Sequence, residues 1–395
     1  MRRGLLLRTM LGMAAAVAVF HAGSVLSGQM ATVDRLRDPG WWPTKGTPPR
    51  ADYVGAGACA ECHRSESATQ PSTSMARTAM TARASHVLRD AKRLTFTGGG
   101  YSFAIVSDPQ PPVYTISNGT QSSSAPLTWA FGAGDVGQSF LFERQGALHE
   151  ARVSYFASIH ALGFTPGRAL GSGHGIADAM GRRVDETEAP RCFGCHTTAS
   201  TAGGKFDPAA AVPGVTCEAC HGPGRRHVAA MKQANAGAGG KTIFDPTTLR
   251  PAASVDFCGA CHATFWDIRL VGAEGTAALR SQPYRLESSR CWTGGDVRLT
   301  CVACHNPHEP LVTDPAAYDY RCLSCHARGL PPVPRPSASS AAAGAHPTSD
   351  QTAPACPVGT SKCVTCHMPK YAVPDMHREF TDHLIQIVKR QSPAS

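Results

Sequence analysis

The stretch Cys217-Glu218-Ala219-Cys220-His221 is one of seven copies of the pattern Cys-x-x-Cys-His in a chain of 395 residues. The seven copies use fourteen of the sixteen cysteines. In chain order the motif residues are Cys59, Cys62 and His63; Cys192, Cys195 and His196; Cys217, Cys220 and His221; Cys258, Cys261 and His262; Cys301, Cys304 and His305; Cys322, Cys325 and His326; and Cys363, Cys366 and His367.

This pattern is the attachment signature of a c-type haem, in which two thiols bind the porphyrin and the adjacent imidazole binds the iron. Zinc ribbons and redox dithiols also use Cys-x-x-Cys, but neither requires His as the next residue. With 17 His in the chain, a chance His follows a given Cys about once in twenty-three cases, so seven accidents are excluded. The sequence therefore predicts seven covalently bound haems, each with iron bound by its motif His.

The N-terminus resembles a secretory signal. Arg2, Arg3 and Arg8 precede an apolar run from Met10 to Phe20, and small residues follow. The alternative is a retained membrane anchor, although the run is short of the roughly twenty residues that span a bilayer. We expect export to the periplasm or the cell surface, with membrane association only if this segment is retained.

The formal net charge of +9 does not indicate a nucleic-acid partner. Residues 1–28 contain three Arg and no acid, and the propionates of seven haems would offset the remaining excess. We interpret the surplus Lys and Arg as partners for these propionates. No nucleic-acid-binding motif is found.

Alternating apolar residues around Tyr101, Phe103 and Ile105, and the β-branched run at Val113, predict strands between the first two motifs. The expected fold is mainly short α-helices and long loops around stacked haems, with a small antiparallel β insertion between haems 1 and 2. The expected segments are 1–28 signal peptide, 29–50 linker, 51–90 haem 1, 91–185 β-rich insertion, 186–330 haems 2–6, 331–355 low-complexity loop, and 356–395 haem 7 with a C-terminal ligand helix.

From the second motif onward, the motif starts are 25, 41, 43, 21 and 41 residues apart. Six motifs in so short a span leave little room for a side-chain core, so haem edges should supply much of the apolar packing. The two short intervals predict close pairs between haems 2 and 3 and between haems 5 and 6.

A sixth iron ligand must come from outside the motifs, and nine histidines beyond the signal are candidates. They are His86, His149, His160, His174, His227, His308, His346, His377 and His383. This supply is sufficient for nearly complete six-coordination.

The chain resembles the cytochrome c-552/4 (cytochrome c554-like) family of multihaem cytochromes c over most of residues 51–390. The stretches that resemble it are 57–63, 217–227 (Cys-Glu-Ala-Cys-His-Gly-Pro-Gly-Arg-Arg-His), 301–308 (Cys-Val-Ala-Cys-His-Asn-Pro-His), 363–370 and the tail 377–383. The resemblance implies bis-histidine coordination in which His227, His308 and either His377 or His383 bind neighbouring haems.

Two departures from that family concern distal ligands. Met75 stands where relatives often have His, so either Met75 or another residue such as His86 would bind that iron. Asp135 stands where relatives often have a further His. The iron ligand that this histidine supplies in relatives would come instead from His149, His160 or His174 in this chain.

The motifs favour an electron-transfer protein over an enzyme, because none of them replaces its His and a saturated iron binds no stray ligand. The expected partners are other cytochromes or quinol-linked reductases. One alternative is a reductase or oxidase that acts on a small nitrogen or sulfur compound at one open haem. Another is a subunit of a conductive filament.

Seven haems can be counted directly. Intact-protein mass spectrometry of the exported protein should show seven haem additions on a chain that lacks its signal, because each intact motif forms two thioether bonds. Six or fewer in a homogeneous, fully matured sample would contradict the expectation.

Overall fold

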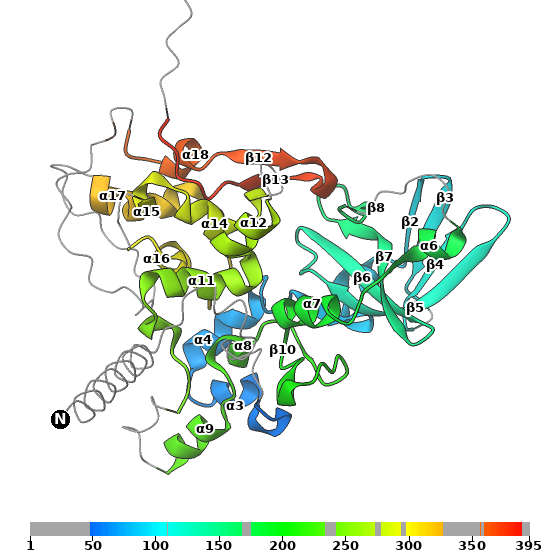
Figure 1. Cartoon of the computed structure of the whole chain (residues 1–395), viewed down its shortest axis with the longest axis horizontal. Helices are drawn as coiled ribbons and strands as arrows, with labels where there is room; N and C mark the ends of the chain where they lie inside the picture. Colours follow the sequence, from blue (N-terminus) through cyan, green and yellow to red (C-terminus); the bar gives the residue numbers. More distant parts are fainter. Residues whose placement is uncertain are drawn as a thin grey trace, which may run out of the picture. The chain divides into compact units, whose positions relative to one another are not determined.

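A computed structural model describes residues 48–108, 110–167, 175–233, 242–272, 278–293, 298–326, 356 and 359–388 (Figure 1). The α-helices are α3 (Ala56–Ala60), α4 (Arg64–Thr69), α5 (His86–Asp90), α6 (Ile176–Met180), α7 (Glu188–His196), α8 (Cys217–His221), α9 (Arg225–Lys232), α11 (Pro251–His262), α12 (Phe265–Val271), α14 (Gln282–Glu287), α15 (Arg290–Thr293), α16 (Cys301–Cys304), α17 (Asp319–His326) and α18 (Cys363–His367). Nearly all are one to three turns long, so packing rather than intrinsic propensity must hold them.

The strands are β1 (Ala79–Thr81), β2 (Arg93–Gly98), β3 (Tyr101–Val106), β4 (Val113–Ser117), β5 (Ser122–Phe131), β6 (Gly137–Arg144), β7 (Ala147–Phe156), β8 (Ala161–Phe164), β9 (Gly181–Arg183), β10 (Thr197–Thr198), β11 (Val212–Pro213), β12 (Lys370–Val373) and β13 (Arg378–Thr381). Nine of them form one antiparallel sheet in the order β2-β3-β4-β5-β6-β7-β8, with β1 beside β5 and β9 beside β7. The pairs β10–β11 and β12–β13 form two small ribbons.

The expected fold of mainly short helices with a small β insertion is wrong. The molecule is mixed, and the sheet is a major element with its own core. The alternation at Phe103 and Ile105 identified only part of it. Strand β5 begins with three serines and contains Pro126, so its sequence carries a weak strand signal although its partners on both sides pair with it.

The sheet curves until its end strands meet, since Phe96 of β2 packs edge-to-face on Phe164 of β8 with ring centroids 5.0 Å apart. Register shifts in β5 between Leu127 and Trp129 and in β6 between Ser139 and Leu141 are bulges that increase local bending. The curved sheet encloses an apolar core whose largest buried side chains are Tyr114, Phe103, Phe140 and Phe142.

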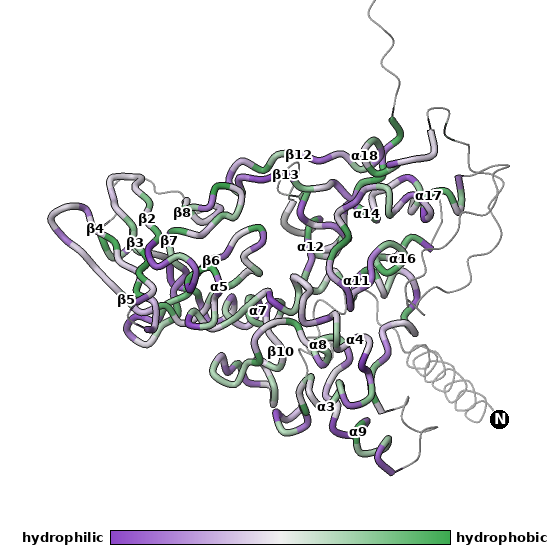
Figure 2. Tube along the Cα trace, turned by 180° about the vertical axis from the view of Figure 1, so that it is seen from behind, coloured by the Kyte–Doolittle hydropathy of each residue, from purple (hydrophilic) through white to green (hydrophobic). Residues whose placement is uncertain are grey.

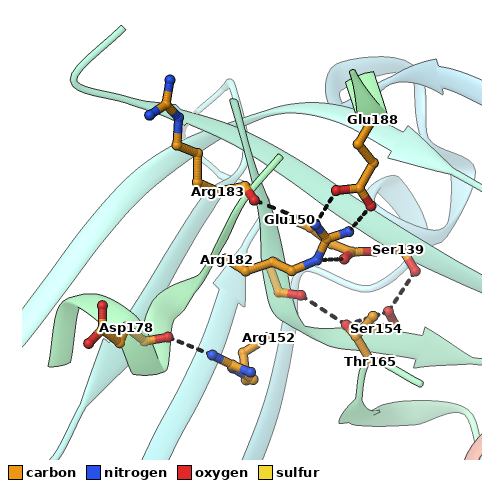
Figure 3. A network of polar contacts seen from close by, with 10 residues as sticks. Ser139, Glu150, Arg152, Ser154, Thr165, Asp178, Arg182, Arg183 and Glu188 are labelled. Carbon is orange, nitrogen blue, oxygen red and sulfur yellow. Dashed lines mark hydrogen bonds and ion pairs between the residues drawn. The ribbon is translucent and has the colours of Figure 1, made fainter. Parts of the chain in front are cut away.

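A polar network ties the sheet to the helix of the second motif (Figure 3). Arg182 of β9 donates to Glu150 of β7 at 2.9 Å and to both carboxylate oxygens of Glu188, the first residue of α7. The hydrogen bond to Glu188, and then the charge of Glu150, raise the pKa of Arg182 against the cost of its partial burial. The sheet therefore holds one of the haem-motif helices directly.

Hydrophobic and hydrophilic residues are mixed along the short helices (Figure 2). Among the described residues no helix has the length and apolar character needed to cross a bilayer.

The sheet core can be tested by truncation. Phe140→Ala removes a side chain that is fully buried, so the free energy of unfolding should fall by about 3–5 kcal/mol. Urea unfolding followed by far-ultraviolet circular dichroism measures the change. Ile159→Ala, at a side chain that is 44% exposed, serves as the control, and equal stabilities of the two variants would argue against a tightly packed core.

Candidate haem sites

All seven motifs lie in the described residues, and each begins in a separate short helix. In helical geometry the residues of Cys-x-x-Cys-His at i, i+3 and i+4 lie on one side of the turn. Both thiols and the imidazole of a motif can therefore reach the same porphyrin, which is the requirement for covalent attachment.

Three motif imidazoles face a second imidazole from a distant segment. The ring centroids are 6.3 Å apart for His63 and His227, 6.1 Å for His221 and His308, and 6.3 Å for His305 and His383. The angles between the ring planes are 28°, 16° and 41° in the same order.

These separations fit the insertion of one iron between each pair of rings. A metal–imidazole bond is about 2.0–2.1 Å long and the ring centre lies roughly 1.1 Å behind the nitrogen, so two imidazoles on opposite sides of one metal have centres about 6.3 Å apart. The residues present at these three sites therefore fit a haem iron with two axial histidines.

Local sequence positions two of the histidines that face a motif imidazole, His227 and His308. Gly222, with φ of +76°, ends α8 and lets the chain turn into α9, which contains His227. Asn306 accepts a hydrogen bond from the backbone nitrogen of His308 at 3.0 Å, and Pro307 between them restricts the turn further. Each of these histidines follows one motif but faces another, so every such pair joins two segments.

The third facing histidine, His383, is held by a buried ion pair. Asp382, 1% exposed, accepts hydrogen bonds from Nε and Nη2 of Arg285 at 2.8 and 2.6 Å and from the backbone nitrogen of Leu384 at 2.9 Å. The hydroxyl of Ser289 donates to the carbonyl oxygen of His383 and accepts a hydrogen bond from the backbone nitrogen of Ile385. Burial, followed by the charge of His305, lowers the pKa of His383 to about 4, so its ring is neutral and able to bind a metal.

Several of these imidazoles have their orientation set by backbone carbonyls. Nδ1 of His221 lies 3.0 Å from the carbonyl oxygen of Phe244. Nδ1 of His367 lies 2.7 Å from that of Gln386, and Nδ1 of His196 lies 3.1 Å from that of Thr78. Because a carbonyl only accepts, Nδ1 must donate. Nε2 is then left as the metal-binding nitrogen, as is usual for ligating histidines.

The second motif is built into the sheet. Phe193, between its cysteines, is fully buried and packs edge-to-face against Trp129 and Phe131 of β5, with centroids 5.1 Å away in both cases. The ring of His196 lies parallel to that of Phe131 at 5.0 Å. Burial lowers the pKa of His196.

The remaining predicted ligands do not face a motif histidine in the described residues. The exposed His377 packs on Phe156 at 4.7 Å, and Met75 is half-buried with its carbonyl bonded to Thr78 and Val215. His149 stacks on Phe142 and His160 approaches Tyr155. His86 lies close to Gly134. His174 and His346 lie outside the described residues.

Two further findings bear on unassigned ligands. Asp135, at the position where relatives often have a histidine, forms an ion pair with Arg77 at 2.6 Å. His196 and His262 make no ring contact with a second histidine among the described residues. Burial is the main cause that lowers the pKa of both; the charge of Arg280 adds to it at both, and the charge of His262 also acts on His196. Sequence reasoning did not single out Arg280.

Contacts between motifs give their spatial order. The thiols of Cys59 and Cys217 touch, as do those of Cys258 and Cys301 and those of Cys322 and Cys363. The first of these contacts raises the pKa of Cys59 and lowers that of Cys217 to about 7. The touching pairs therefore belong to motifs 1 and 3, 4 and 5, and 6 and 7.

Weaker contacts join the pairs. The Cys195 thiol lies 3.4 Å from the carbonyl of Ala260, which links motif 2 to motif 4. Cys220 lies near enough to Cys258, and Cys304 near enough to Cys322, for a thiolate at the first position to raise the pKa of the second. The motifs thus follow the order 1-3-4-5-6-7, with motif 2 joined at motif 4. None of the touching thiol pairs joins motifs 2 and 3 or motifs 5 and 6, which are the motifs separated by the shortest sequence intervals.

A family model matches part of the chain. Residues 150–222 match the family model described as cytochrome c554 and c-prime. This region contains β9, motifs 2 and 3 and most of β7, and the match supports a c-type cytochrome with covalent haem. No curated protein matches the chain.

A solved structure, the outer cell wall cytochrome OcwA, is similar at 14% identity and a TM-score of 0.36. The alignment covers 85% of this chain and 80% of that one.

The distal assignments predict spectra. His227→Ala and His308→Ala should each convert one low-spin haem to high-spin without loss of haem, because each removes one of two axial nitrogens. Electron paramagnetic resonance of the oxidised protein measures the change, and His160→Ala should leave the spectrum unchanged. Low-spin spectra in both distal variants would contradict the assignment.

Proposed function

We propose that this protein is a seven-haem c-type cytochrome that transfers electrons between redox partners outside the cytoplasm. The observation that supports it most is the set of three facing imidazole pairs. Iron held between two histidines has no position left for a substrate and changes its coordination little on reduction, which suits an electron carrier.

The order of the motifs supports a relay. Where the first cysteines of two motifs touch, the attached porphyrin edges must be close, because each thioether bond places its haem within a bond length of the sulfur. Electrons could then pass along the order 1-3-4-5-6-7. The haem supplies the redox chemistry when bound, while the protein residues hold each ring in place, choose its axial donors and limit its exposure to water.

The expected partners are other cytochromes or quinol-linked reductases, and the expected location is the periplasm or the cell surface. The sequence pattern at the N-terminus motivates the location. Motifs 1, 2 and 7 stand at the ends of the relay and are the natural points of electron entry and exit.

One observation favours a second candidate, a reductase for a small anionic nitrogen or sulfur compound. Arg280 lies near His196 and His262, neither of which faces a second imidazole among the described residues. Its guanidinium lies over the ring of Phe380 at 5.1 Å and donates to the sulfur of Met376 at 3.7 Å. A cation beside an iron with an open position would attract an anion.

A reductive titration followed by visible absorption distinguishes the two functions. An electron carrier with seven haems in different surroundings should be reduced over a broad range of potentials and should pass electrons readily to a soluble acceptor. Added cyanide should not change its spectrum. Steady turnover of nitrite, hydroxylamine or tetrathionate that is lost in Arg280→Gln would instead establish the reductase.

A further inference from the structure

Glu218 lies between the two cysteines of motif 3 and is 3% exposed. Its carboxylate accepts hydrogen bonds from the backbone nitrogens of Val54, Gly55 and Gly224, each at 2.8 Å. Gly55 is the residue that precedes α3, the helix of motif 1. A side chain of motif 3 therefore fixes the start of the motif 1 helix.

Asp319 makes the same kind of contact at the other end of the relay. It is the first residue of α17, the helix of motif 6, and is 9% exposed. Its carboxylate accepts the backbone nitrogens of Lys362 and Cys363 at 2.6 and 2.8 Å. Cys363 begins α18, the helix of motif 7.

The two carboxylates share three properties. Each comes from one motif helix and binds the start of another, and each lies at a junction where the first cysteines touch. Neither forms an ion pair with a described residue. Backbone N–H dipoles stabilise both charges, and at Asp319 a hydrogen bond from the Cys363 thiol adds to them. Their charges are felt locally: burial and then Glu218 raise the pKa of Tyr53, while burial and then Asp319 raise the pKa of Cys363 to about 11.

We propose that Glu218 and Asp319 are positioning residues that hold haem pairs 1/3 and 6/7 together and keep the reduction potentials of these pairs low. A buried negative charge beside a haem edge favours the oxidised iron, which carries one more positive charge, and the low dielectric of the interior strengthens this effect. The inference rests on the proposed electron-transfer function.

The amide variants separate charge from shape. Glu218→Gln and Asp319→Asn keep the size of the side chain and one accepting oxygen but remove the charge. Asp52→Asn and Asp314→Asn are matched controls. Asp52 is 40% exposed and ion-paired with Arg225, and Asp314 is exposed, so solvent screens both charges.

Potentiometric titration of the complete, haem-loaded protein measures the effect, with haem content counted by mass spectrometry. Glu218→Gln should move one part of the titration curve to more positive potential and Asp319→Asn a different part. The double variant should show both shifts together, since the sites are independent. The two control variants should superimpose on the parent protein, and Glu218→Asp, which keeps the charge, should lie close to it.

Fully loaded Glu218→Gln and Asp319→Asn variants that superimpose on the parent curve would overturn the inference. So would equal shifts in Glu218→Gln and Glu218→Asp, because the effect would then come from shape. If the parent protein itself takes up electrons only together with turnover of a substrate, the proposed function fails, and that result appears before any variant is compared.

Discussion

Under the proposed function the structure depends on one constraint: an iron that is bound to its motif histidine requires a second nitrogen on its opposite face. In the three pairs that the structure brings together, the second imidazole comes from a segment 78 to 164 residues away, as in His305 with His383 and His63 with His227. Each pair thus closes a long loop of the chain. Short helices that could not persist alone can be held in this way, because the iron joins two segments as a covalent cross-link would.

Buried and half-buried polar groups position the motif helices and one of the facing histidines. The Arg285–Asp382 pair orders the tail that contains His383, and Arg182 attaches the helix of motif 2 to the sheet through Glu188. An isolated buried charge is costly, whereas one with two or three hydrogen-bond partners gives a defined geometry. The carboxylates of Glu218 and Asp319 apply the same principle between one motif helix and the next.

The sheet is both a folding unit and the surface on which the second motif packs. Its core of Phe103, Tyr114 and Phe140 needs no cofactor, in contrast to the helical segments. The outer face of β5 nevertheless receives Phe193 and His196 of motif 2. A stable sheet beside a cofactor-dependent region gives the chain one surface on which a haem-motif helix can be fixed.

The sequence alone determined the chemistry, because covalent attachment needs Cys-x-x-Cys-His in consecutive positions and such local patterns are read directly. It also indicated His227 and His308, whose turns depend on neighbouring Gly, Pro and Asn. Tertiary structure decided the size of the sheet and the spatial order of the motifs. It also decided the position of Arg280 near His196 and His262 and the contacts of the Glu218 and Asp319 carboxylates with distant backbone amides. Those features arise from residues such as Glu218 and Gly55 that are 163 positions apart, and no local pattern records which distant backbone amide a buried carboxylate will meet.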